Sequence, residues 1–446
     1  MISYANQRRA RPIVARTVLL IWTWVAQPAA SENALTSGAS SAPGTTLSLA
    51  EAQKLAFAQN WDLLAARSDV DIATAQRFVA REFPNPTLGF GMTKVSVDSA
   101  YPNTGSGFWG RSYDTVAAVS QLVEIGGKRR ARKDSATAGL KGAEARWADA
   151  RRLLDQGVAQ AYVAALLAER NREVLTNSAA SLRQEARIAE VRERAGDLSA
   201  SDRSQIEIAA QRLELDAEAA TASARNARIQ LEVLLGVKQP VGDVQLSDAL
   251  EPLAETPAVP TNTVAAVMTR PDVRAAELAH TKAESDVRLQ KAQRVPDPTF
   301  FGQYEHEPPD LPNTVGFGVS FPLPLWNRNK GNISAAQATL EQTRLQAEKV
   351  RAQAAADVVV AQNSYGSALS RWQRYRDELQ PKSGKIRKTV AYAYEKGGAS
   401  LLDLLSAQRN DNDIRLATAQ AAADAATAAA ALKTALNLTD MTTLNK

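Results

Sequence analysis

The sequence has no cysteine, only two histidines and few aromatic residues. Without cysteine, disulfides, thiolate metal sites and a lipid-modified cysteine are excluded. His280 and His306 are far apart and lack metal-ligand spacing, and Glu305 and Glu307 beside His306 form only a nonspecific cluster. We therefore predict no metal site and no cofactor. No serine-nucleophile motif or paired-carboxylate signature stands out, so we expect that the protein is not an enzyme.

Long apolar runs are also missing. The only apolar run near the start covers residues 18–25, far short of the ~20 residues of a spanning helix. Four arginines precede it and two alanines follow, a pattern typical of a secretory signal. We predict a signal peptide over 1–30 and a flexible segment over 31–46. Removing those four arginines leaves +1 of the formal +5 charge, so we expect no nucleic-acid partner.

The remaining chain contains an internal duplication. Phe83–Thr87 returns as Val295–Thr299, and residues 120–140 return as 320–340. We predict a first repeat over 47–236 and a second repeat over 261–440. A linker over 237–260 would join them, and a C-terminal tail over 441–446 would follow. Each repeat is expected to contain a helix, a strand pair (85–124 or 297–322) and a long helical hairpin.

Long helices follow from alanine-rich heptads. Alanine or larger apolar residues recur every seven positions from Leu140 to Ala189. The complementary heptad position carries Ala136, Ala143, Ala150, Gly157 and Ala164. In the second repeat the same position recurs every seven residues from Ile333 to Tyr375. Sustained heptads predict a left-handed coiled coil, and alanine at the contact positions predicts close helix approach. A helix from about Lys128 to Arg194 is expected. Gly196 and Gly397 then mark the tips where each hairpin turns back.

Four segments of about ten residues alternate like membrane β-strands. Leu88, Phe90 and Met92 show the pattern, and Thr314–Phe321 shows it most clearly. With no other helix able to span, we expect any membrane insertion to use these strands. Four strands cannot close a barrel, so several chains would have to share one. The alternative is a soluble hairpin half buried on the helices.

A basic cluster follows the first strand pair. Lys128 lacks the spacing of a phosphate loop, so its two preceding glycines are interpreted as a turn. Lys128, Arg129 and Arg130 begin a helix, where the macrodipole disfavours cations. Arg328 and Lys330 occupy the equivalent place in the second repeat. We expect anionic headgroups of outer-membrane lipid to compensate these five residues; a solvated charge run is the alternative.

Three segments give the chain a family resemblance: residues 124–129, residues 321–331, and Tyr394–Gly397 followed by Leu402–Leu405. The chain resembles the outer-membrane efflux (TolC-like) family, and most closely its heavy-metal efflux (CzcC-like) branch. The resemblance implies a mainly α fold with a small β part. Duplicated helical hairpins would form a trimeric α-barrel, and four strands per chain would contribute to a twelve-stranded transmembrane β-barrel. It also implies a homotrimer in the outer membrane of a Gram-negative bacterium, extending into the periplasm.

The same resemblance implies partners and site residues. A periplasmic membrane-fusion adaptor and an inner-membrane, proton-driven RND-type pump would complete the system. Asp403 matches an aspartate ring at the periplasmic tip, and Tyr394 and Asp202 match residues that help to lock it. Ala399 and Ser406 stand where the family has an arginine of the lock and a second ring aspartate.

We therefore expect a passive exit duct for exported cations. A multidrug or type I secretion duct of the same fold is one alternative, and a periplasmic coiled-coil adaptor or scaffold without a pore is another. The strand alternation favours a duct over the scaffold.

Overall fold

The computed structural model describes residues 46–97, 113–254, 267–307 and 311–438. The predicted signal peptide and C-terminal tail lie outside these residues, as does almost all of the predicted N-terminal segment. None of the described helices is both long enough and apolar enough to cross a membrane.

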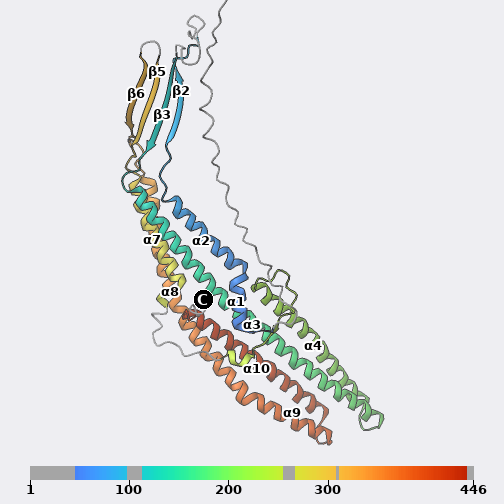
Figure 1. Ribbon diagram of the computed structural model, residues 1–446. Helices are drawn as coiled ribbons and strands as arrows, with labels where there is room; N and C mark the ends of the chain where they lie inside the picture. Colours follow the sequence, from blue (N-terminus) through green and yellow to red (C-terminus); the bar gives the residue numbers. More distant parts are fainter. Residues whose placement is uncertain (1–45, 98–112, 255–266, 308–310, 439–446) are drawn as a thin grey trace, which may run out of the picture. The chain divides into compact units, whose positions relative to one another are not determined.

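Long helices dominate each repeat (Figure 1). The main helices are α1 Leu49–Gln59, α2 Trp61–Val79, α3 Lys128–Arg194, α4 Ala200–Leu234, α7 Pro271–Ala292, α8 Lys330–Arg374, α9 Gln380–Glu395 and α10 Leu401–Ala435. Helix α3 packs against α4, α7 and α10, while α8 packs against α7 and α10. The predicted bounds of α3 are confirmed. The hairpins α3–α4 and α9–α10 are thus joined through the contact of α3 with α10.

The second hairpin contains a feature that the heptads do not predict. Between α8 and α9 the chain makes a π-helical turn, Tyr375–Leu379. Pro381 lies in the first turn of α9 and has no N–H to donate to the carbonyl of Asp377. A single widened turn lets the helix continue past such a residue.

The predicted heptad contacts are confirmed in the second repeat and partly wrong in the first. Ala354 and Ala361 are buried in the core that α8 shares with α10. In α3, by contrast, Ala164 is exposed, and Tyr162 and Val163 are buried beside it. An α-helix of 67 residues drifts by about 20° per heptad relative to a strict seven-residue repeat, which rotates the buried face away from the expected position.

The segment predicted as a linker is partly folded onto the first repeat. Strand β1 (Thr46–Leu47) pairs in parallel with β4 (Gln245–Leu246), and the short helix α5 (Leu250–Leu253) follows. The buried carboxylate of Glu232 accepts hydrogen bonds of 2.7–3.2 Å from the four backbone N–H groups of residues 241–244. One α4 side chain thereby organises the turn that leads into the second repeat.

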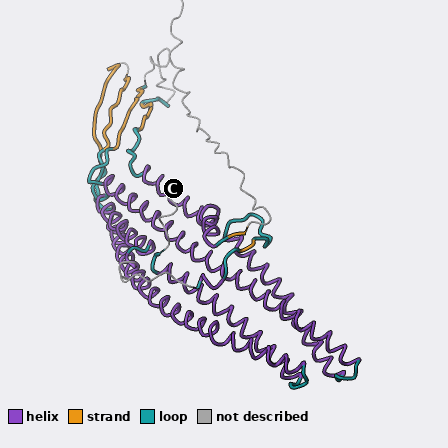
Figure 2. The backbone as a smooth tube through the Cα atoms, turned by 60° about the horizontal axis from the view of Figure 1, so that its bottom comes forward, coloured by secondary structure: helices purple, strands orange, loops and turns teal. Residues whose placement is uncertain are grey.

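The four other strands form one antiparallel sheet (Figure 2). Their order is β2-β3-β5-β6, as labelled in Figure 1. Their bounds are β2 Thr87–Thr93, β3 Asp114–Leu122, β5 Thr299–Glu307 and β6 Leu311–Ser320. The predicted strand pairs are confirmed, and they join through β3 and β5. Within the described residues, β2 and β6 each have one edge without a paired strand.

The register gives the sheet two chemically different faces. Leu88 pairs with Val119, and Phe300 with Val319, so these side chains share one face with Phe317. The opposite face carries small or polar residues such as Gly89, paired with Ala118, and Gly316, paired with Gln303. In the described part of the chain, contacts with the helices are too few to bury either face. This argues against a hairpin half buried on the helices.

Close packing between β5 and β6 makes one glycine a test of the sheet. A Cβ atom at Gly318 would lie 2.4 Å from Cζ of the Phe301 ring. We expect Gly318→Val to displace the Phe301 ring from its packing against β6 and to reduce the folded, heat-modifiable form on semi-native gels. Gly91→Val is the matched control, because a Cβ there meets no atom within 4 Å. Equal loss in both variants would mean that the Phe301–Gly318 packing does not hold the strands together.

Candidate functional site

The candidate site is the end of the two hairpins that lies away from the sheet (Figure 1). Gly196 and Gly397 have φ angles of 85° and 75°, the left-handed conformation that glycine adopts without strain. The N–H of Gly398 donates to the carbonyl of Ala393 at 2.8 Å and closes the end of α9. Both predicted turns are therefore present as glycine-terminated helix ends.

Asp403 lies in the first turn of α10, where it completes a capping box. Its Oδ2 accepts hydrogen bonds from the Ser400 hydroxyl (2.6 Å) and backbone N–H (3.0 Å). The Ser400 hydroxyl also accepts from the Asp403 N–H at 3.2 Å. The hydroxyl and then the backbone N–H of Ser400 hold the pKa of Asp403 below its usual range. The side chain is exposed, so the capping aspartate also presents a fixed negative charge to solvent.

Tyr394 lies where the two hairpins touch. Its side chain packs against a buried apolar cluster of Leu182, Ala189, Ile206, Ala210 and Leu401, contributed by α3, α4 and α10. The guanidinium of Arg192 lies 5.4 Å from the Tyr394 ring centre. The hydroxyl is buried without a hydrogen-bond partner in the described part of the chain. Burial raises the pKa of Tyr394; the charge of Arg192 opposes this effect, and the charges of Asp202 and Glu185 add to it.

Asp202 belongs to the first turn of α4, and its N–H donates to the capping hydroxyl of Ser199 at 3.0 Å. Asp202 lies close enough to Tyr394 for its charge to raise the pKa of the tyrosine, although no hydrogen bond joins the two side chains in the described residues. Ser406 is exposed, three residues after Asp403 on α10. Because Ser406 stands at the position of the second ring aspartate, Asp403 alone remains as the acidic residue predicted for the ring.

The structure separates the five residues of the predicted lipid-facing cluster. Lys128 Nζ turns inward to Asp297 Oδ1 at 2.7 Å and to the Val295 carbonyl at 2.6 Å. Arg129 donates to the carbonyl of Arg81 and lies 4.0 Å from the Phe83 ring centre. For these two the expectation of headgroup compensation is corrected, because protein acceptors already compensate them.

The other three members of that cluster are Arg130, Arg328 and Lys330. Each is exposed, and none forms an ion pair with any acidic residue in the described ranges. A contact with lipid headgroups therefore remains a prediction for these three alone.

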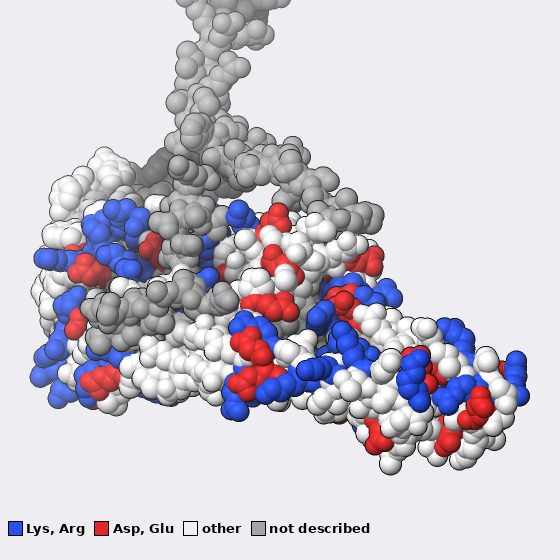
Figure 3. Space-filling view, turned by 90° about the horizontal axis from the view of Figure 1, so that it is seen from below, with Lys and Arg blue, Asp and Glu red and all other residues white. Residues whose placement is uncertain are grey.

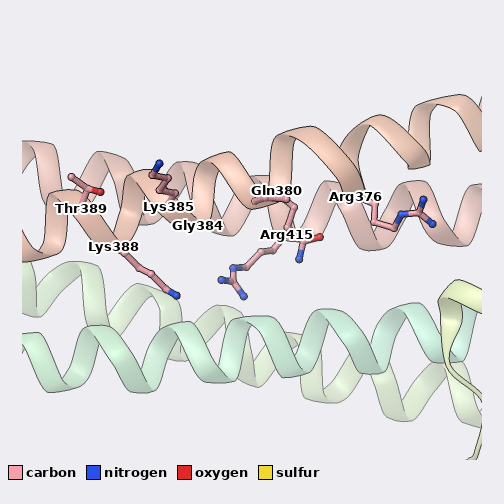
Figure 4. Close-up of a pocket in the computed structure, with 8 residues that line it drawn as sticks. Arg376, Gln380, Gly384, Lys385, Lys388, Thr389 and Arg415 are labelled. Carbon is pink, nitrogen blue, oxygen red and sulfur yellow. The ribbon is translucent and has the colours of Figure 1, made fainter.

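A basic groove beside the π-helical turn was not predicted from the sequence. It encloses about 630 Å³ and is lined by Arg376, Gln380, Pro381, Gly384, Lys385, Lys388, Thr389 and Arg415. Lys388 and Arg415 point into the gap between α9–α10 and α3–α4 (Figure 4). Asp377 lies 2.7 Å from Arg376, and Asp411 lies 2.8 Å from Arg415. Lys385 and Lys388 form no ion pair with any described residue, so they are the uncompensated charges of the groove. Charges of both signs are interspersed over the face seen from below (Figure 3).

One acidic cluster approaches the geometry of a metal site. Asp114, Glu305 and Glu307 converge at the far end of the sheet, and Asp114 was not recognised from the sequence. Lys94 Nζ lies 3.0 Å from Asp114 and also contacts Glu307, so an ammonium group already occupies the position of a cation. We assign no metal to this cluster.

A profile of the outer membrane efflux protein family matches residues 53–237 and 264–438. The chain belongs to this family. Family membership confirms the resemblance and the outer-membrane location predicted from the sequence. The family consists of efflux proteins and is not a family of enzymes.

Two curated relatives come from Cupriavidus metallidurans. The cobalt-zinc-cadmium resistance protein CzcC is 26% identical over 366 residues, which cover 81% of this chain and 83% of CzcC. The nickel and cobalt resistance protein CnrC is 26% identical over 253 residues, covering 55% of this chain and 59% of CnrC.

Solved structures confirm the mainly α fold with a small β part. A membrane protein from Pseudomonas aeruginosa aligns with a TM-score of 0.75 at 20% identity, covering 87% of this chain and 92% of that one. CusC gives a TM-score of 0.75 at 18% identity, with coverages of 87% and 91%. The Neisseria gonorrhoeae MtrE outer membrane channel gives 0.74 at 20% identity, with coverages of 87% and 88%.

Proposed function

We propose that this protein is the outer-membrane exit duct of a tripartite efflux system for heavy-metal cations. The observation that carries the metal assignment is the similarity to two metal-resistance proteins, one of them over most of both chains. Its role is passive: the duct gives cations a path out, while a periplasmic adaptor and an inner-membrane RND-type pump supply capture and energy.

The duct is proposed to be a homotrimer. The sheet has an apolar face and a small or polar face, and among the described residues its edges at β2 and β6 are unpaired. Unpaired backbone groups are not tolerated in lipid, so a sheet of this kind has to close on itself. Three chains joined from β6 to β2 would close twelve strands, with the glycine-rich face toward the lumen.

The hairpin tips are the proposed docking and gating region. Gly196 and Gly397 lie in exposed turns. Three copies of Asp403 would meet around the narrow end of the duct, where a ring of carboxylates attracts cations and repels anions. The tip contact at Tyr394 would hold this end narrow until the adaptor engages it.

Purified protein tests the duct directly. In mild detergent, mass measurement should give three chains, and insertion into a planar bilayer should give discrete, cation-preferring conductance steps. A monomer or dimer without conductance would contradict the proposal and favour the adaptor or scaffold. Anion-preferring channels would instead keep the duct and contradict the cation assignment.

Transport is expected to be independent of histidine. His280 Nδ1 lies 3.4 Å from the hydroxyl of Thr343 on α8, whereas His306 belongs to β5, so the two rings belong to different parts of the repeat. The double variant His280→Ala, His306→Ala should keep cobalt, zinc and cadmium resistance within about twofold in cells that carry the cognate pump. Loss of resistance at normal trimer levels would reveal a ligand site that contains a histidine.

A further inference from the structure

A second basic pocket lies where the sheet of the second repeat meets its helices. It is an open depression of about 470 Å³ lined by Lys291, Arg294, Val295, Pro324 and Arg328, all of them exposed. Lys291 and Arg294 come from the end of α7 and the turn after it, and Arg328 comes from the segment between β6 and α8. Three cations from two separate segments therefore surround one cavity.

None of these three cations has an acidic partner in the described chain. Many other arginines do have such a partner; Arg344, for example, lies 2.7 Å from Glu341 and 2.6 Å from Glu348. Holding three like charges around a cavity is unfavourable without a counter-charge. The lining of this pocket therefore favours an anionic ligand.

The internal duplication supplies a comparison within the same chain. Val79 and Glu82 stand at the positions equivalent to Lys291 and Arg294, and Lys128 stands at that of Arg328. Lys128 is turned inward to Asp297. The equivalent positions of the first repeat thus do not carry three unpaired cations, so this cluster is not a requirement of the shared architecture.

Exposed apolar side chains adjoin the pocket. Leu323 and Leu325 flank the pocket residue Pro324, and they are 66% and 61% exposed; the neighbouring Trp326 is 92% exposed. Tryptophan with flanking cations is typical of a membrane–water interface. A small hydrophilic anion would neutralise the three cations but would leave these apolar side chains in water. An amphiphilic anion would neutralise the cations and also cover the apolar side chains.

We propose that this pocket binds the phosphate of an anionic diacyl phospholipid, with its acyl chains against Leu325 and Trp326. The proposal rests on the proposed function, because it places the sheet in the membrane and the pocket at the periplasmic leaflet. One bound phospholipid per chain would anchor the junction of sheet and helices in the second repeat, where each cation contributes to attraction for anionic lipid.

Native mass spectrometry of the trimer with phosphatidylglycerol or phosphatidylcholine tests the site. We expect up to three bound phosphatidylglycerol molecules and at least tenfold weaker phosphatidylcholine binding. The Lys291→Gln, Arg294→Gln, Arg328→Gln variant should bind phosphatidylglycerol on the order of tenfold or more weakly. The matched control is Lys382→Gln, Lys385→Gln, Lys388→Gln, which removes the same charge from α9 and should bind normally. Equal loss in both variants would show general charge attraction and overturn the proposal.

A second pair of measurements separates the lipid from its headgroup. Leu325→Ser, Trp326→Ser should weaken phosphatidylglycerol binding severalfold although all three cations remain. Displacement of phosphatidylglycerol by inorganic phosphate at equal concentration would instead show a site for free anions, and tight binding of an acidic peptide in place of lipid would show a protein-docking site. Trimer mass and conductance, measured on the same samples, report on the duct separately from the lipid.

Discussion

Replacing Asp403 with lysine is expected to abolish or invert the preference of single channels for cations. In a trimer this substitution changes six elementary charges around one constriction, and fields of that size alter local ion concentrations on the order of tenfold or more. The side chain is exposed in the first turn of α10, and both hydrogen bonds from Ser400 end on Oδ2. The carboxylate can therefore cap the helix and face the lumen at once. The reversal potential in a salt gradient measures the effect.

Two further variants separate charge from capping. Asp403→Asn should weaken the cation preference while keeping a side chain that accepts from Ser400. Ser400→Ala removes the hydroxyl partner but keeps the charge, so selectivity should remain while the hairpin end loosens. If Asp403→Lys and Asp403→Asn both keep wild-type selectivity and conductance, Asp403 serves only as a cap and the ring does not face the lumen.

The direction of the Asp403 pKa also predicts a pH response. An ordinary aspartate titrates near about 3.9, and the hydrogen bonds from Ser400 lower that value in the folded chain. A depressed pKa means that the charge, and the stability of the capping box, are present above the unfolded pKa and are lost as pH falls through the folded pKa. Cation preference should therefore be unchanged between pH 7 and about pH 5. A decline over that range would mean that repulsion between the three carboxylates exceeds the effect of the cap.

Adding bulk at Ala361 is expected to reduce the trimer yield strongly. Ala361 is buried in α8 against a core that includes Val273, Val358 and Leu432. Leucine at such a position forces neighbouring side chains or helices apart, and overpacking typically costs about 1–3 kcal/mol. Ala361→Leu should accordingly lower the thermal midpoint in detergent and the amount of trimer recovered from membranes.

Two other substitutions serve as controls for Ala361→Leu. Ala164→Leu places the same bulk on an exposed position of α3 and should have a smaller effect. Substitution of Gly397 by alanine strains a turn with a φ of 75° but disturbs no packed core. It should leave assembly intact and impair adaptor docking. Similar assembly defects in all three variants would refute the division between packed hairpins and docking tips.

Much of the fold was predictable because its signals are local and repeated. The Lys128 start of α3, the glycine tips and the alternating strands each follow from short-range rules. The internal duplication then allowed each feature in one repeat to support its counterpart in the other. Ala164 was assigned wrongly because a strict heptad drifts against the period of a long helix.

The site was less predictable because it depends on contacts between distant segments. The partner of Lys128 is Asp297, 169 positions away along the chain, so the sequence showed its charge but not its inward turn. The contact between Tyr394 and Arg192 joins two hairpins, and the pocket at Arg328 joins α7 to the segment after β6. The run of basic residues in α9 was a usable signal for the groove at Lys388, although not for its position next to the π-helical turn.

Metal efflux in intact cells tests the central claim most directly. Cells that carry the cognate pump and adaptor should be loaded with cobalt, zinc or cadmium, and the metal that leaves the cell should be measured over time with and without this protein. The account predicts that efflux into the medium falls severalfold without the protein and that the wild-type gene restores it, while the export of organic drugs is unaffected. Unchanged metal efflux together with lost drug export would contradict the account and assign the duct to a multidrug system.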